Sequence, residues 1–357
     1  MLDIASYESA AQGVLTEQVW DFIQGGSGSE SALAANRAAL DRLRIRPRVL
    51  VDVSQCSTAT TVLGAPLAAP LGVAPMAYHR LACPDGETAT AEAAGKAGSL
   101  LTVSMFASRT LEDIAAAASG PLWLQLYWLR ERQALVELAA RAAAAGFQAL
   151  VLTVDAPRVA RRPRDVRSGF SVPGDIRAVN LPAALMSSSH RRTEGASAIE
   201  KHSREQFDSS ITWADLAWLR ERTGLPLILK GVLTAEDARL ALAHGASGVV
   251  VSNHGGRQLD SAVASADALP EVVDAVAGRA LVAVDGGIRH GGDLLKVLAL
   301  GADLAMVGRP VFWGLAQGGA TGAAEVLRLL TEELDEAMAL SGCPRLTEIT
   351  RALITSR

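Results

Sequence analysis

Short apolar runs alternate with alanine-rich segments of helical periodicity along most of the chain. The apolar runs are rich in Val, Leu and Ile and are bounded by glycine, proline or polar residues, which is typical of strands buried on both faces. We count eight of them. They are APLGVAP (69–75), LLTVS (100–104), LWLQLY (122–127), ALVLTVD (149–155), LPLILK (225–230), GVVVS (248–252), ALVAVD (280–285) and LAMVG (304–308).

The segments between these runs predict helices. In TAEDARLALAHG, Thr234 is a capping residue at the start and Gly245 follows the end. Repeated strand–helix alternation predicts a (β/α)8 TIM barrel. The rival is a doubly wound sheet, which usually has a glycine-rich nucleotide loop after its first strand. The corresponding segment here, GVAPMAYH, is not such a loop.

We predict a single domain over residues 1–357. The spacing of the apolar runs divides it into several parts. Residues 1–65 precede the barrel and predict two helices, around GVLTEQVWDFIQGG and ESALAANRAALDRL, then a short β-pair that could plug the barrel bottom. The barrel spans 66–318 and C-terminal helices span 319–357. A long insertion after the fourth strand, about 166–212, predicts an active-site lid. Its polar middle, SSSHRRTEGASAIEKHSREQFDSS, predicts a poorly ordered section.

Composition narrows the class of protein. The chain has 357 residues, 49% hydrophobic and 20% charged, with a net charge of −4, so it can bury a large core and has no nucleic-acid footprint. Three scattered cysteines, Cys56, Cys83 and Cys343, form no ligand cluster, so we expect no metal site and a reducing cytoplasm. We see no secretory signal, and no apolar run approaches the ~20 residues that span a bilayer.

Polar side chains gather at the predicted strand ends. In a (β/α)8 barrel the carboxyl ends of the strands carry the chemistry. Exposure to water could explain any one of these residues, but lysine, histidine and aspartate at one barrel rim converge on one space. The candidates are Ser104, Gln125, Tyr127, Thr153, Asp155, Lys230, Ser252, His254, Asp285, Gly308 and Arg309.

The last two barrel loops predict a phosphate site. DGGIRHGGD follows the seventh strand and GRP follows the eighth. Gly286 and Gly287 permit close backbone approach, and Arg289 and Arg309 add positive charge. These loops are the usual phosphate grip of the fold, although two ordinary glycine-rich turns are the alternative. Because no Walker A loop is present, a cofactor phosphate is favoured over a nucleoside triphosphate.

Four basic side chains predict chemistry at the barrel mouth. A buried Lys230 should face an electron-rich ligand. His254 could be a general base whose second nitrogen is held by Asp155, or else a satisfied core histidine. Arg162 and Arg257 could grip a carboxylate with forked hydrogen bonds. The run RRPRDVR around Arg162 could also be a solvated surface.

Five stretches in order carry a resemblance to a known family. They are SNHGGRQLD, TVDAPRVARRPRD, LILKGV, DGGIRHGGD and VGRP. Together they resemble the FMN-dependent 2-hydroxy-acid oxidase family, which includes glycolate oxidase, lactate oxidase and mandelate dehydrogenase. The resemblance extends over nearly the whole chain. Within the family, WDFIQGGSG, QLYWLR and HRRTEGASA are most similar to the members that oxidise 4-hydroxymandelate in glycopeptide-antibiotic biosynthesis.

The resemblance implies a role for each candidate. His254 would take the substrate hydroxyl proton, or the Cα proton in a carbanion mechanism, and Asp155 would orient it. Arg162 and Arg257 would bind the carboxylate, and Tyr127 would bond the hydroxyl oxygen.

It also implies a flavin site. Lys230 would lie by flavin N1 and O2 and stabilise the reduced anion. Ser104, Gln125 and Thr153 would bond the isoalloxazine edge. The other implied FMN contacts are Pro75, Met76, Ala77, Ser252, Asp285, Gly286, Gly287, Arg289, Gly308 and Arg309. A grip for one terminal phosphate, without an adenosine fingerprint, favours FMN over FAD.

Two positions refine the expected reaction. Many family members carry a substrate-binding tyrosine where this chain has Phe22, and Phe22, Met105, Phe106 and Tyr127 would line an aromatic pocket. Some dehydrogenase members carry glycine at Ala77 and react poorly with oxygen, whereas alanine resembles the oxidases. We therefore expect oxidation of an (S)-2-hydroxy acid, mandelate or 4-hydroxymandelate, with O2 reduced to H2O2.

The sequence is also compatible with other functions. A glycolate- or lactate-type oxidase is one, and a mandelate dehydrogenase that passes electrons to a quinone or carrier protein is another. Membrane docking would favour the dehydrogenase, but the apolar stretch of the insertion, AVNLPAALM (178–186), is short. An FMN-barrel isomerase or a non-catalytic flavin protein would leave the His254, Arg257 and Arg162 set unexplained. The family suggests a homo-oligomer, a tetramer or octamer.

Overall fold

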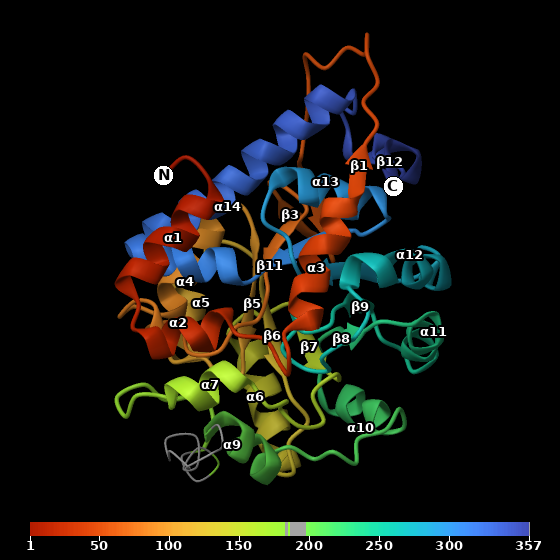
Figure 1. Ribbon diagram of the computed structural model, residues 1–357. Coiled ribbons are helices and arrows are strands. Elements are labelled where there is room, and N and C mark those ends of the chain that lie inside the picture. Colours follow the sequence, from red (N-terminus) through yellow and green to blue (C-terminus); the bar gives the residue numbers. More distant parts are fainter. Residues whose placement is uncertain (183–184, 186–197, 357) are drawn as a thin grey trace.

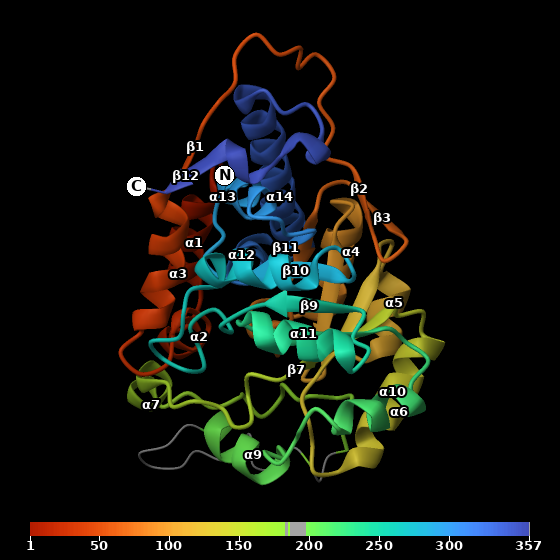
Figure 2. The ribbon, with the colours of Figure 1, turned by 90° about the vertical axis from the view of Figure 1, so that its right-hand side faces the viewer.

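The computed structural model describes residues 1–182, 185 and 198–356. Eight parallel strands form a closed barrel surrounded by helices (Figures 1 and 2). The strands are β4 (Leu71–Val73), β5 (Leu100–Ser104), β6 (Leu122–Leu126), β7 (Ala149–Thr153), β8 (Leu227–Val232), β9 (Gly248–Val251), β10 (Leu281–Asp285) and β11 (Leu304–Val307). They neighbour one another in chain order, and β11 pairs with β4 to close the barrel. The predicted (β/α)8 barrel is confirmed, and the doubly wound sheet is excluded.

The barrel interior is filled by side chains from alternate strand positions. A hairpin of β2 (Thr60–Val62) and β3 (Ala65–Leu67) supplies Val62 and Leu67 to the same cluster. Leu100 and Ala149, which begin their strands, belong to it as well, so the hairpin covers the amino-terminal end of the barrel. The remaining members are Ala74, Trp123, Val151, Ile228, Val250, Ala283, Leu304 and Met306.

The outer helices are amphipathic and cover the barrel. Thr234 accepts a hydrogen bond from the Asp237 amide at the start of α11, and Gly245 follows its end with φ +76°, as the sequence predicted. The outer helices are α4 (Glu87–Lys96), α5 (Leu111–Ala117), α6 (Arg132–Ala144), α10 (Asp215–Arg222), α11 (Ala235–Ala243), α12 (Ser265–Val276), α13 (Gly291–Ala299) and α14 (Arg309–Ser341). Short 3₁₀ turns occur at η1 (His79–Leu81), η2 (Leu346–Glu348) and η3 (Arg351–Leu353).

The N-terminal segment contains three helices where the sequence predicted two. They are α1 (Ile4–Val14), α2 (Glu17–Gln24) and α3 (Ser31–Arg42). The predicted first helix began too early, because the Thr16 hydroxyl caps α2 and separates it from α1. Helix α1 was not predicted, because it buries only Ile4, Tyr7 and Ala11 and its apolar pattern is weak. A short strand, β1 (Leu43–Ile45), pairs with β12 (Ile354–Ser356) near the C-terminus.

The predicted boundary at residue 319 falls on a break in α14. Gly318 and Gly319 leave helical geometry there, and Gly319 has φ +55°. Beyond the break, Val326, Leu330, Leu334 and Met338 are buried on one face, so this part of α14 packs on the body of the protein.

The insertion after β7 contains α7 (Pro163–Ser168) and α9 (Ala198–Gln206). Both views place these helices on one side of the molecule, opposite the β1–β12 pair (Figures 1 and 2). Residues 187–197 of the predicted poorly ordered section, which include all but the last residue of HRRTEGASA, lie outside the described residues, and much of the remainder forms α9. In AVNLPAALM, residues 183, 184 and 186 lie outside them as well. Within the described chain, no helix is long and apolar enough to cross a membrane.

Candidate active site

A cavity opens at the carboxyl ends of the barrel strands and brings together most of the predicted site residues. They arrive from different strands, loops and the N-terminal segment. Those that line the cavity are Phe22, Pro75, Met76, Ala77, Ser104, Phe106, Gln125, Tyr127, Thr153, Arg162, Lys230, His254, Arg257, Asp285, Gly286, Gly287, Arg289, Gly308 and Arg309. The described residues hold no cluster of three or more His, Cys, Asp or Glu side chains suited to a metal ion.

Three predicted residues lie behind the cavity wall. Asp155 stands behind His254, and Ser252 lies fully buried between two charged groups. Met105 was predicted to line the pocket, but the structure places it behind the cavity wall. It is fully buried, and its Sδ atom accepts a hydrogen bond from the Tyr127 backbone amide at 3.0 Å. Met105 therefore supports Tyr127 and does not itself form the wall.

His254 stands just after β9 in a backbone conformation that is uncommon for a residue with a side chain. Its φ is +59°, and those of Gly255 and Gly256 are +62° and +75°. The three left-handed residues turn the chain sharply, which glycine permits at little cost. The Ser252 hydroxyl accepts the His254 amide at 2.9 Å and helps to hold this turn. The turn directs the imidazole into the cavity immediately after a buried strand.

The imidazole has a defined partner on each ring nitrogen. Nδ1 lies 3.0 Å from Oδ1 of Asp155, and Nε2 lies 3.4 Å from the Tyr127 hydroxyl. Burial lowers the pKa of His254, and the positive charge of Lys230 adds to this effect, while the Asp155 carboxylate opposes it. The net direction is downward, so the neutral imidazole, which can accept a proton, is favoured.

Lys230 is part of a buried polar chain at the barrel mouth. Its Nζ donates to the Ser252 hydroxyl at 2.9 Å, and that hydroxyl donates to Oδ1 of Asp285 at 2.6 Å. Lys230 also forms an ion pair with Asp285 at 3.1 Å. Burial lowers the pKa of Lys230, but the carboxylates of Asp285 and Asp155 outweigh it, and the pKa is raised overall. Lys230 therefore places a positive charge in the cavity.

Hydroxyl and amide groups form a ladder beside Lys230. The Ser104 hydroxyl donates to Oε1 of Gln125 at 3.2 Å, and Nε2 of Gln125 donates to the Thr153 hydroxyl at 2.9 Å. These residues belong to three adjacent strands, β5, β6 and β7, so the barrel register places them in a row. The ladder offers donors and acceptors along one wall.

Two arginines bring positive charge to the cavity beside His254. One Arg257 nitrogen donates to the carbonyl oxygens of Phe22 and Gly25, both at 2.7 Å, which fixes the guanidinium. Arg162 is buried, and its Nε has no hydrogen-bond partner within the described chain. Asp165 lies 3.8 Å from Arg162. Burial raises the pKa of Asp165, although Arg162 opposes the shift.

Aromatic side chains line two walls of the cavity. Phe22 stacks on Phe170 with ring centroids 4.2 Å apart. Tyr127 stacks on Phe207 at 4.7 Å, and Phe106 lies 6.2 Å from Phe207. Sequence reasoning missed Phe207, which lines the cavity, and Phe170, which stacks behind Phe22; the insertion supplies both. An aromatic residue in the mostly polar stretch before Asp208 was the available signal for Phe207.

His202 and Ser203, on α9, line the cavity as well and were also missed. The His202 ring meets Phe106 edge-on at 5.8 Å. The insertion thus contributes to the cavity wall, in agreement with its predicted place over the site.

The far end of the cavity is strongly basic. Arg309 donates to the carbonyl oxygens of Ile23 at 3.0 Å and Gly255 at 3.2 Å, and Arg289 lies over the Trp313 ring. Burial, together with nearby arginines, lowers the pKa of Arg309 to about 9. Within the described chain, the contacts of these two guanidinium groups are to neutral groups. This set of donors fits the phosphate of FMN, while the ladder and Lys230 fit the polar edge of its ring.

The absence of a side chain at Gly286 and Gly287 has a structural reason in addition to the predicted close approach of a phosphate. A β-carbon at Gly287 (φ +81°) would lie 2.6 Å from the Asn36 carbonyl oxygen, and one at Gly286 would lie 3.2 Å from the Asn36 amide nitrogen. Helix α3 is therefore the close neighbour of Gly287, and Gly286 lies between α3 and Ser265 of α12, whose hydroxyl would be 3.0 Å from a β-carbon there. This contact had no counterpart in the sequence pattern.

Comparisons with known proteins identify the family of the chain. The chain matches the FMN-dependent dehydrogenase family over residues 11–356. It is 48% identical to 4-hydroxymandelate oxidase of Amycolatopsis orientalis over 342 residues, 96% of this chain and 95% of that protein. It is 44% identical to L-lactate oxidase of Nostoc sp. over 357 residues, 99% and 98% of the two chains. A solved structure of mandelate oxidase with (S)-4-hydroxymandelic acid has a TM-score of 0.96 and 45% identity, with 100% and 99% of the chains covered.

The chain belongs to the FMN-dependent dehydrogenase family. Its enzyme class is that of the FMN-dependent 2-hydroxy-acid oxidases, and it is similar to 4-hydroxymandelate oxidase. The family, the enzyme class and the FMN cofactor predicted from the sequence are confirmed.

Proposed function

We propose that the enzyme oxidises an (S)-2-hydroxy acid with an aromatic side group, (S)-mandelate or (S)-4-hydroxymandelate, to the corresponding 2-oxo acid. The hydroxyl and Cα hydrogens leave the substrate, and O2 is reduced to H2O2. The aromatic lining of the cavity beside His254 carries this proposal, because a phenyl ring can pack against Phe22, Phe106 and Phe207. The likeness to 4-hydroxymandelate oxidase supports it.

His254 is the base in this proposal. Its Nε2 faces the cavity, and its other nitrogen meets Asp155 at 3.0 Å, so the carboxylate can hold the imidazole and stabilise its protonated form. The lowered pKa keeps the ring neutral before the reaction. FMN, when bound, supplies the two-electron acceptor. The Tyr127 hydroxyl lies 3.4 Å from Nε2, and in this proposal it bonds the substrate hydroxyl oxygen.

Arg162 and Arg257 bind the substrate carboxylate. The backbone carbonyls that receive one Arg257 nitrogen fix the direction of its guanidinium. Arg162 has an unpaired buried donor in the described chain, which a carboxylate would satisfy. Charge-assisted pairs of this kind hold a 2-hydroxy acid with its Cα directed to His254.

Oxygen is the proposed electron acceptor, and peroxide the proposed product. Ala77, which lines the cavity, is the residue that resembles the oxidases at this position. Rapid mixing of anaerobically reduced enzyme with aerated buffer tests it. The yellow colour should return quickly with release of peroxide, whereas slow recovery that a quinone dye accelerates would favour a dehydrogenase.

The decisive test of substrate class compares kcat/KM for (S)-mandelate, (S)-4-hydroxymandelate, glycolate and (S)-lactate. Mandelates should be preferred, because burying a phenyl ring contributes about 2–3 kcal/mol at ~25 cal/mol per Å². If glycolate or lactate equals or exceeds mandelate, the enzyme is a glycolate- or lactate-type oxidase.

Three further features belong to the proposal. The cysteines Cys56, Cys83 and Cys343 are free, which is compatible with a cytoplasmic enzyme. A homo-oligomer, tetramer or octamer, and a place in antibiotic biosynthesis rest on the resemblance to the 4-hydroxymandelate-oxidising members. Size-exclusion chromatography with light scattering tests the oligomeric state.

A further inference from the structure

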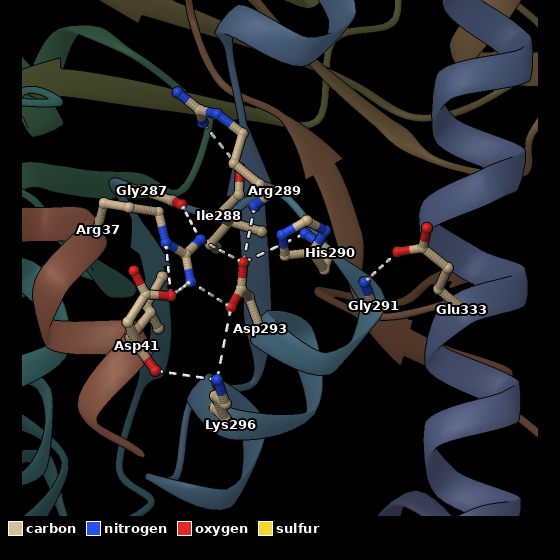
Figure 3. A network of polar contacts seen from close by, with 11 residues as sticks. Arg37, Asp41, Gly287, Ile288, Arg289, His290, Gly291, Asp293, Lys296 and Glu333 are labelled. Carbon is tan, nitrogen blue, oxygen red and sulfur yellow. Dashed lines mark hydrogen bonds and ion pairs between the residues drawn. The ribbon is translucent and has the colours of Figure 1, made fainter. Parts of the chain in front are cut away.

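A network of polar contacts joins helix α3, outside the barrel, to the loop after β10 (Figure 3). Arg37 donates from one nitrogen to the carbonyl oxygen of Gly287 at 2.8 Å. Its two terminal nitrogens also donate to the two carboxylate oxygens of Asp293, at 2.6 and 2.8 Å. This forked pairing is the strongest geometry available to an arginine and a carboxylate.

Asp293 passes this restraint to the backbone of the loop. Its Oδ2 atom accepts the amides of Arg289 at 2.9 Å and His290 at 3.2 Å. Asp293 is only 1% exposed, so these contacts are shielded from water. Arg37 thus holds the loop at the carbonyl oxygen of Gly287, and Asp293 holds it at the amides of Arg289 and His290. The contacts lie on both sides of Arg289, whose guanidinium belongs to the phosphate site.

The same pairing cancels a charge. A buried carboxylate beside Arg289 would repel a bound phosphate unless a cation compensates it. Arg37 is the partner that meets both carboxylate oxygens, whereas the Lys296 ammonium is 3.8 Å away. Removal of Arg37 would therefore leave a less compensated anion next to the phosphate site and release Gly287 at the same time.

We propose that Arg37 is a positioning residue for the FMN phosphate. It fixes the loop of residues 286–290 in the shape that presents Arg289, and it neutralises Asp293. The N-terminal segment thereby completes a cofactor site that the barrel loops alone do not hold in place. The absence of a side chain at Gly287, where a β-carbon would lie 2.6 Å from the Asn36 carbonyl oxygen, permits α3 to come this close. The inference concerns cofactor binding and does not depend on the identity of the substrate.

The test compares two flavins that differ only in the phosphate. The full-length chain, stripped of flavin, is titrated with FMN and with riboflavin, and binding is followed by flavin fluorescence. For Arg37→Met we expect FMN affinity to fall about 10- to 100-fold, as charged hydrogen bonds allow, and riboflavin affinity to stay within about twofold. Arg42→Met is the control, because Arg42 lies on the same helix and pairs with Asp267 at the surface.

Two variants separate the charge from the fold. Asp293→Asn in the Arg37→Met background keeps an oxygen for the loop amides but removes the anion, so FMN affinity should partly recover. Arg37→Lys keeps the charge without the fork and should weaken FMN less than Arg37→Met. Equal loss of FMN and riboflavin in both Arg37 variants would show a general structural role and overturn the proposal, as would unchanged FMN binding.

Discussion

Nδ1 of His254 lies 3.0 Å from Oδ1 of Asp155, while Nε2 faces the cavity. A carboxylate on one ring nitrogen fixes the tautomer in which that nitrogen carries the proton and the other is free to accept one. The left-handed backbone of His254, with φ +59°, is held by surrounding contacts at a cost of about 1–3 kcal/mol. The fold thus maintains an unfavourable local conformation that brings a base to the barrel mouth.

His254→Ala should lower kcat by about 10²- to 10⁴-fold, the usual contribution of a general base. It should keep FMN, because Arg289 and Arg309 at the phosphate end are untouched. Bleaching of the flavin by mandelate under nitrogen measures the chemical step, and the absorbance spectrum measures cofactor content. His244→Ala, in a histidine at the end of α11, is the matched control. A nearly normal bleaching rate in the His254 variant would exclude it as the base.

The acid side of the pH profile should report His254. Burial lowers its pKa, so the neutral base persists below the ordinary histidine value of about 6.5, and kcat/KM should fall only as the pH drops through the lowered pKa. Asp155 raises this pKa, so Asp155→Asn should move the acid limb to still lower pH and also reduce kcat. Profiles of kcat/KM against pH check both effects. An acid limb that moves upward in Asp155→Asn would contradict the assignment.

The barrel could be predicted because its strands are buried on both faces and read as continuous apolar runs. LPLILK ends at Lys230, which enters the site, and GVVVS ends at Ser252, two residues before His254, so both site residues were visible in the sequence. Helix α1 was not, because only Ile4, Tyr7 and Ala11 face the core.

The site residues in the insertion could not be predicted, because they are set by how the insertion folds back. Its pattern of apolar and polar residues does not encode that path. Phe207 reaches Tyr127 because a bridge joins Leu129 to Phe207, and Asp208 next to it pairs with Arg132 at 2.5 Å. The reverse error occurred at Met105, an apolar residue beside the site that faces the core. Its direction follows from the turn after β5, which apolar character alone does not specify.

Arg162→Met should weaken the use of 2-hydroxy acids by about 10- to 150-fold in kcat/KM, corresponding to a charged hydrogen bond of ~1.5–3 kcal/mol. The loss should be much smaller for the methyl ester of the same acid, which has no carboxylate to bind. Arg161→Met is the control, because its side chain is the exposed neighbour in the same segment. Equal losses for acid and ester would mean that Arg162 does not act on the carboxylate.

Phe207→Ala should reduce kcat/KM for (S)-mandelate more than for glycolate. The Phe207 ring stacks on Tyr127 at 4.7 Å and belongs to the aromatic wall, so its loss removes apolar contact that only a ring-bearing substrate uses. Large-to-small changes at buried aromatic positions can also destabilise a protein by about 3–5 kcal/mol. Phe207→Leu, which keeps much of the volume, therefore accompanies it, and should give the same direction with a smaller ratio. A uniform loss for both acids in both variants would indicate a structural role alone.

Phe22→Tyr should shift preference toward small acids. The Arg257 guanidinium lies over the Phe22 ring, with its central carbon 5.3 Å from the ring centroid, and Phe22 also stacks on Phe170. A hydroxyl added to this ring brings a donor toward the carboxylate site, which glycolate and lactate can use as well as mandelate. It also places a polar group against the apolar wall, which costs only a substrate whose phenyl ring packs there. The ratio of kcat/KM for (S)-mandelate to that for glycolate should therefore fall in the variant. Phe170→Tyr adds the same hydroxyl on the other ring of the stack and serves as the control. If the ratio rises in Phe22→Tyr, or falls equally in both variants, Phe22 does not determine the choice between aromatic and small substrates.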